Sequence, residues 1–106
     1  MNKKLINIYY FLFLLVIIFP NTLNADDFFD KGKKIFLEDG NCATCHKLQD
    51  ANSNGNIGPN LDEIRPDITR VIHAVTNGIG VMPAYDGILS TEDIKAVATY
   101  VAESAN

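Results

Sequence analysis

Two cysteines and a histidine stand close together and offer the chain its clearest chemistry. Cys42, Cys45 and His46 form a C-x-x-C-H motif. At this spacing the two thiols lie about one helical turn apart, so each can add to one of the two vinyl groups on the same edge of a macrocycle. The motif is the signature of covalent c-type haem attachment. We therefore expect one haem c, held covalently through Cys42 and Cys45.

His46 follows the second cysteine directly, which places its imidazole beneath the iron of a haem attached there. Only neutral imidazole ligates a metal, and its second ring nitrogen needs an acceptor that fixes the ring and strengthens donation. We assign His46 as the proximal iron ligand.

The other face of such a haem is either open or closed by a second ligand. Met82 is the only methionine beyond residue 25, and Pro83 stiffens the loop that carries it. A thioether is a soft ligand that favours ferrous iron. The alternative is that Met82 fills a gap over the haem as a flexible apolar side chain. We expect Met82 to be the sixth ligand.

Three other uses of the cysteines compete with haem attachment. A zinc site would need His73, which falls about 150° from the centre of the apolar stripe on its helix. A redox dithiol would need a βαβ pattern that the sequence lacks. A disulfide between cysteines three apart closes a tiny loop and leaves His46 without a role. We expect His73 to be a solvated surface residue.

Helical periodicity predicts the elements that position these residues. Apolar residues share one face over residues 26–39, and Gly40 ends that segment. A second helix follows Asp67 as N-cap, over residues 67–76, and a third begins at Ser90 with an acidic residue three positions later. The polar stretch 49–56 and the glycine-rich stretch 77–89 read as loops. No alternating strand pattern or repeat is found, so the sequence predicts one all-α domain of three to four helices.

The N-terminus has the order of a secretory signal peptide. Lys3 and Lys4 precede an apolar run over residues 5–19, and a segment ending in Ala25 has the small residues of a cleavage site. The run is shorter than the roughly 17–25 residues of a membrane-spanning helix, so an uncleaved anchor is the weaker alternative. We expect residues 1–25 to be the signal and residues 26–106 the mature domain.

The charge of the mature domain excludes one class of partner. Losing the two N-terminal lysines leaves seven basic against thirteen acidic side chains, a formal charge of −6. Nucleic acid is therefore not expected as a partner. The acidity serves solubility, or it steers the domain toward a basic-surfaced partner.

Over residues 27–103 the chain resembles a class I c-type cytochrome of the short bacterial kind. In that family a Gly-Pro-Asn-Leu segment, here Gly58 to Leu61, follows the haem motif. The resemblance implies that the Pro59 carbonyl accepts the hydrogen bond of the proximal histidine. It also matches Met82-Pro83 to the family's ligand loop. The family's packing glycine and aromatic residues match Gly32, Phe36 and Tyr100.

The resemblance implies a fold wrapped around one haem and an electron carrier rather than an enzyme. We expect a soluble monomer in the periplasm that passes single electrons between redox proteins of a respiratory or dehydrogenase chain, and that meets a membrane only if the N-terminal segment is retained. Two alternatives remain open. One is a dedicated subunit of a periplasmic dehydrogenase, and the other is a ligand-binding haem enzyme or sensor.

Overall fold

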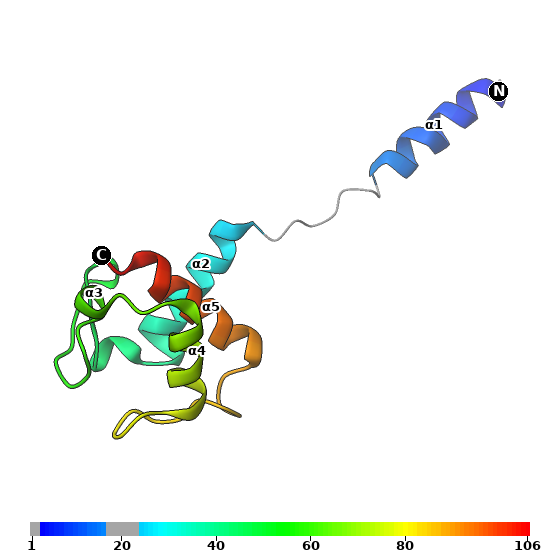
Figure 1. Cartoon of the computed structure of the whole chain (residues 1–106). Helices are drawn as coiled ribbons and strands as arrows, with labels where there is room; N and C mark the ends of the chain where they lie inside the picture. Colours follow the sequence, from blue (N-terminus) through cyan, green and yellow to red (C-terminus); the bar gives the residue numbers. More distant parts are fainter. Residues whose placement is uncertain (1–2, 17–23) are drawn as a thin grey trace.

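The computed structural model describes residues 3–16 and 24–106. Helix α1 (Lys3–Val16) lies apart from the remaining helices (Figure 1). No helix in these described ranges combines the length and the apolar character that crossing a membrane requires. Residues 17–23, which include the end of the apolar run and the first residue of the expected cleavage segment, lie outside the described residues, while the segment's last two residues, Asn24 and Ala25, are described. Cleavage after Ala25 stays a prediction.

The domain itself is helical, as the sequence predicts. Helix α2 (Ala25–Lys34) packs against the C-terminal helix α5 (Thr91–Ser104), and α4 (Ile68–Asn77) packs against α5 from another side (Figure 1). A short helix, α3 (Leu61–Ile64), precedes α4. The all-α fold class is confirmed, with α2 to α5 making up the domain.

The helix boundaries follow from capping. The Asp67 carboxylate accepts a hydrogen bond from the backbone N–H of Arg70 at 2.8 Å, which begins α4. The Ser90 hydroxyl accepts one from the N–H of Asp93 at 3.1 Å, which begins α5. These bonds satisfy backbone donors that a helix start otherwise leaves unpaired. Both N-caps were predicted from the sequence.

The crossing of α2 and α5 depends on a glycine. A Cβ atom on Gly32 would lie 2.2 Å from the carbonyl oxygen of Ala96 and 2.7 Å from the Cβ of Tyr100, so only a bare backbone fits there. The Tyr100 ring packs edge-on against Phe36, with ring centroids 5.7 Å apart, and against Phe29 at 5.0 Å. Phe36 and Tyr100 are almost fully buried. The packing role that the resemblance implies for Gly32, Phe36 and Tyr100 is therefore present.

The loop after the cysteine motif is tied back to this crossing. The Tyr100 hydroxyl donates a 2.6 Å hydrogen bond to the carboxylate of Asp50. The Lys33 ammonium lies 3.2 Å from the same carboxylate and donates to the Asp50 carbonyl at 3.0 Å. Two helices and the polar loop thus meet at one carboxylate.

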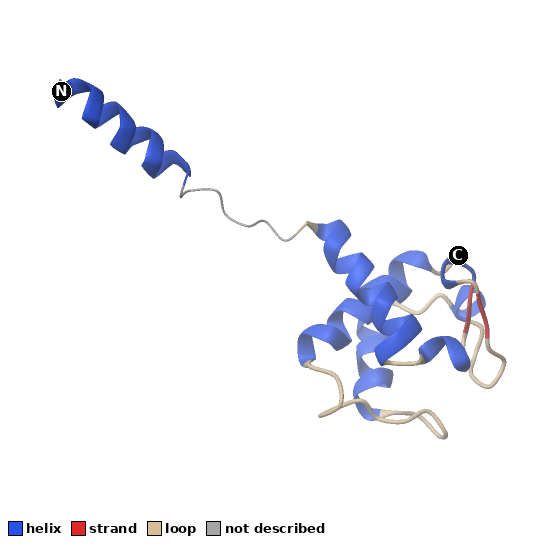
Figure 2. Ribbon diagram, turned by 180° about the vertical axis from the view of Figure 1, so that it is seen from behind, coloured by secondary structure: helices blue, strands red, loops and turns tan. Residues whose placement is uncertain are grey.

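Three local features differ from the sequence prediction. The helix over residues 26–39 ends in a π-helical turn at Ile35–Asp39 rather than running on as α-helix. Two antiparallel strands of two residues each, β1 (Lys47–Leu48) and β2 (Ser53–Asn54), form a hairpin in the polar loop (Figure 2). Ile68, which helical periodicity places in the apolar stripe of α4, is 39% exposed at the first position of the helix.

Candidate cofactor site

An apolar cavity of about 370 Å³ lies within the helical domain. Its volume falls within the roughly 300–1,000 Å³ of small-molecule and cofactor pockets. Helices α4 and α5 supply Val71, Val75, Val97 and Val101, and the π-helical turn supplies Phe36. The cavity also takes in the predicted site residues, which are Cys42, Cys45, His46, Pro59 and Met82.

The two cysteines are presented on one tight turn. Asn41 adopts a left-handed conformation with φ of 51°, and the 3₁₀ turn Cys42–Thr44 begins directly after it. The backbone N–H groups of Cys45 and His46 both donate to the carbonyl of Cys42, at 3.1 and 3.0 Å. This turn brings both half-buried thiols to the same cavity wall.

The thiols are chemically suited to an apolar partner. They are not joined by a disulfide. Burial raises the pKa of the Cys42 thiol to about 11, so this group stays neutral at physiological pH. The Cys42 side chain is thus an uncharged group in an apolar wall.

The His46 ring is fixed from two sides. Its Nδ1 atom lies 2.8 Å from the carbonyl oxygen of Pro59. A carbonyl only accepts, so Nδ1 carries the proton and Nε2 keeps a lone pair for a metal. A Cβ on Gly58 would lie 2.5 Å from Cε1 of the same ring, so the backbone itself closes over the imidazole. The hydrogen bond that the resemblance implies is present, while iron binding by His46 stays a prediction.

Met82 reaches the cavity from the loop between α4 and α5. The backbones of Ile79 and Met82 exchange two hydrogen bonds, Ile79 N–H to Met82 carbonyl at 3.2 Å and Met82 N–H to Ile79 carbonyl at 2.9 Å. Gly78 ends α4 at φ of 71° and lies so close to the Met82 carbonyl that a Cβ there would be 2.6 Å away. This compact turn carries the half-buried Met82 side chain into the cavity wall.

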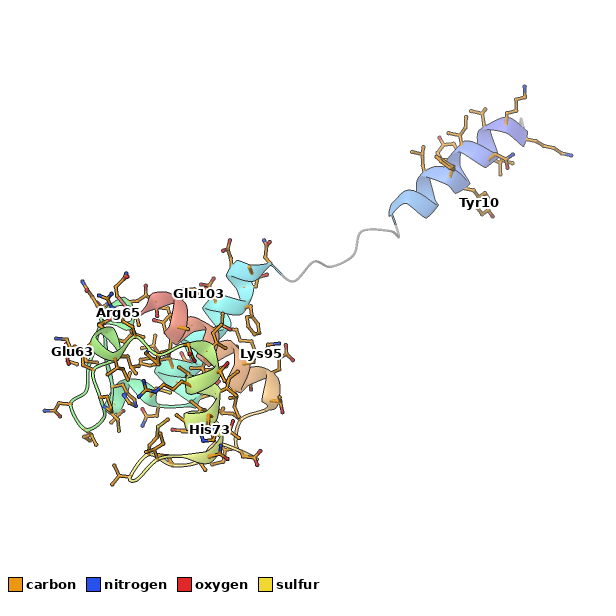
Figure 3. The ribbon with its side chains drawn as sticks, in the orientation of Figure 1. Tyr10, Glu63, Arg65, His73, Lys95 and Glu103 are labelled. Atoms are coloured by element: carbon orange, nitrogen blue, oxygen red, sulfur yellow. The ribbon has the colours of Figure 1, made fainter. Side chains whose placement is uncertain are left out.

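His73 is not part of this site. It is exposed on α4 (Figure 3), where its ring nitrogen lies 3.2 Å from the Asn77 amide. Within residues 3–16 and 24–106, no three His, Cys, Asp or Glu side chains gather in a way that could hold a metal ion. The described part of the chain therefore gives no support to a zinc site built from the cysteines and the histidines.

Two lining residues were missed from the sequence. Arg70 is the only cationic side chain among the described residues that line the cavity, and Tyr85 lines it with its hydroxyl bonded to the carbonyl of Gly40. Neither residue belongs to a motif, so the sequence gives no signal for it. Only the three-dimensional position of the loop after α4 brings Tyr85 to the cysteine turn.

The residues present fit a haem. The cavity wall is mostly aliphatic, as a porphyrin face requires, and the thiols and the imidazole come from a single turn at one side of it. The thioether of Met82 comes from a separate loop. The Nδ1 bond to Pro59 leaves Nε2 of His46 with a free lone pair, which is the tautomer that binding to a metal would require.

Comparison with known proteins gives the same family from sequence and from structure. Residues 27–101 match the family model described as "Cytochrome C oxidase, cbb3-type, subunit III". Cytochrome c6 of Chlorolobion braunii is 34% identical over 84 residues, which cover 70% of this chain and 88% of the relative. The cbb3-type oxidase subunit FixP of a Bradyrhizobium species is 46% identical over 76 residues, 66% of this chain but 25% of FixP.

The solved structure of the c-type cytochrome SorU from Sinorhizobium meliloti is similar, with a TM-score of 0.72 and 54% identity. The match covers 76% of this chain and 93% of SorU. Fold and site define a small haem-binding electron-transfer protein, and the chain belongs to the class I monohaem c-type cytochromes. Members of this family carry electrons with a haem c and exchange them with redox proteins.

Proposed function

We propose that the protein is a periplasmic one-electron carrier with one haem c, bound covalently by Cys42 and Cys45 and ligated by His46 and Met82. The observation that carries the proposal is that one apolar cavity receives both thiols, the imidazole and the thioether from two separate segments. The apolar cavity wall disfavours the higher charge of ferric iron, and the thioether of Met82 favours ferrous iron. Both effects would raise the reduction potential.

The haem, when bound, supplies a single iron that cycles between ferric and ferrous states. The protein chain fixes the position of the haem and excludes water from it. The Pro59 carbonyl keeps the His46 ring in one orientation, and the compact turn around Met82 keeps the thioether in place. His46 and Met82 would hold the iron in both oxidation states, so little would have to move when an electron is transferred.

The proposal also covers the export of the protein and the kind of partner that it meets. Residues 1–25 act as a signal peptide, and residues 26–106 form the exported, monomeric domain. The acidic surface favours a basic-surfaced redox partner. Support comes from the basic start and apolar run of the N-terminus and from the excess of acidic residues beyond it.

Haem attachment is tested by extraction. Acid–acetone treatment of the purified holoprotein should leave the colour with the polypeptide, because thioether bonds survive it. Cys45→Ser should retain less haem and fold less well, since the haem fills much of the core. Ala43→Ser, between the cysteines, is the matched control and should retain haem fully. Release of the wild-type haem into the solvent would overturn covalent attachment.

A further inference from the structure

Tyr85 forms a link between the two halves of the site. Its hydroxyl donates a 2.5 Å hydrogen bond to the carbonyl of Gly40, a residue 45 positions earlier in the chain. Gly40 lies two residues before Cys42, at the end of the π-helical turn. Among the hydrogen bonds of the described residues, this is the one that joins the loop 78–89 to the segment 35–46.

The Gly40 end of this link is hydrogen-bonded within the π-helical turn. The Gly40 N–H donates to the carbonyl of Ile35 at 2.8 Å, which closes the π-helical turn. Gly40 is buried, and a Cβ there would lie 3.0 Å from the Sγ of Cys42. The π-helical turn thus leaves the Gly40 carbonyl free to accept from outside its own helix, beside the cysteine turn.

The Tyr85 end is tied to the Met82 turn. The Tyr85 N–H donates to the carbonyl of Val75 at 2.8 Å, which fixes this residue against the last turn of α4. Only Pro83 and Ala84 separate Tyr85 from Met82. None of the residues next to Met82 belongs to the buried core: Ala84 is exposed, and Val81 and Pro83 line the cavity.

We propose that Tyr85 is a positioning residue that holds the Met82 loop closed by bonding it to the Gly40 carbonyl. The inference rests on the proposed ligation of iron by Met82. Release of the Met82 loop separates the Tyr85 hydroxyl from Gly40, so this bond adds to the free energy that an external ligand must overcome to displace the thioether. Burial also raises the pKa of Tyr85, which keeps its hydroxyl a donor through mildly alkaline pH.

Imidazole titration of the ferric holoprotein tests the proposal, followed through the sulfur-to-iron charge-transfer band in the far red. Tyr85→Phe removes the hydroxyl and keeps the ring. Losing one net hydrogen bond should tighten imidazole binding about two- to tenfold. The matched control is Tyr100→Phe, which removes the 2.6 Å bond to Asp50 in a part of the core outside the cavity lining. It should leave imidazole affinity unchanged even though it lowers stability.

The outcomes separate this proposal from the one on which it rests. A wild-type protein with the band, and a Tyr85→Phe variant with wild-type imidazole affinity, would overturn the role of Tyr85 alone. A wild-type protein without the band would overturn Met82 ligation and the role of Tyr85 together. Equal tightening in Tyr85→Phe and Tyr100→Phe would also overturn it, because the effect would then reflect general loss of stability.

Discussion

The Nδ1 atom of His46 lies 2.8 Å from the carbonyl oxygen of Pro59, and the Gly58 backbone covers the same ring. One peptide segment thus sets the tautomer of the imidazole and limits its rotation. A methyl group in place of the Gly58 hydrogen would lie 2.5 Å from Cε1 and 2.8 Å from Nδ1 of His46. The ring and this segment cannot both keep their places in such a variant.

Gly58→Ala should therefore destabilise the holoprotein by about 1–3 kcal/mol, the usual cost of forcing an extra carbon into a packed site. Thermal unfolding followed at the haem absorption measures it. Asn56→Ala, at an exposed position of the same loop, is the control and should change stability by less than about 0.5 kcal/mol. Equal stability of the two variants would contradict the close packing of Gly58 on the ring.

Gly32→Ala offers a test in which two physical effects have opposite signs. Alanine favours an isolated helix by about 1 kcal/mol over glycine. Here its Cβ would lie 2.2 Å from the Ala96 carbonyl oxygen, so α2 and α5 would have to separate. We expect net destabilisation of about 1–3 kcal/mol in denaturant unfolding. Asp30→Ala, on the exposed face of α2, serves as control. A stabilised Gly32→Ala protein would refute the close crossing.

Much of this architecture could be predicted from the sequence, because its signals are local. The C-x-x-C-H spacing, the N-caps Asp67 and Ser90 and the apolar stripe of α5 each lie within one or two helical turns. Periodicity could not reveal the π-helical turn at Ile35–Asp39. Such a turn holds one more residue than an α-helical turn and differs from it in the hydrogen-bond pattern, which amino-acid composition does not record. The Tyr85 to Gly40 bond spans 45 residues, and no local pattern encodes it.

Stability should depend on pH through Asp50. The Tyr100 hydroxyl hydrogen bond lowers the pKa of the Asp50 carboxyl, and Lys33 contributes in the same direction. A group whose folded pKa is depressed adds stability above its unfolded pKa of about 3.9, and that stability is lost as pH falls through the folded value. The advantage of wild type over Tyr100→Phe in unfolding free energy should thus shrink below about pH 4. Urea titrations between pH 7 and pH 3 measure it. An advantage constant over that range would mean that the carboxylate charge plays no part.

Salt should slow electron transfer to a basic partner if the acidic surface steers docking. The screening length falls from about 30 Å at 10 mM ionic strength to about 8 Å at 0.15 M. Stopped-flow rates with a small redox protein of net positive charge should fall over this range, while rates with a neutral small-molecule reductant should not. If the rates with the basic protein and with the neutral reductant are both independent of salt, the acidic surface does not steer docking and serves solubility alone.

Carbon monoxide binding to the reduced holoprotein at neutral pH tests the central claim most directly. If His46 and Met82 occupy both axial positions, no coordination site is open, and the wild-type spectrum should change slowly or not at all after carbon monoxide is added. Met82→Ala should bind the gas at once, because the thioether that closes the site has been removed. Rapid binding by the wild-type protein would contradict the assignment of an electron carrier and indicate a five-coordinate iron suited to gas sensing or peroxidase chemistry.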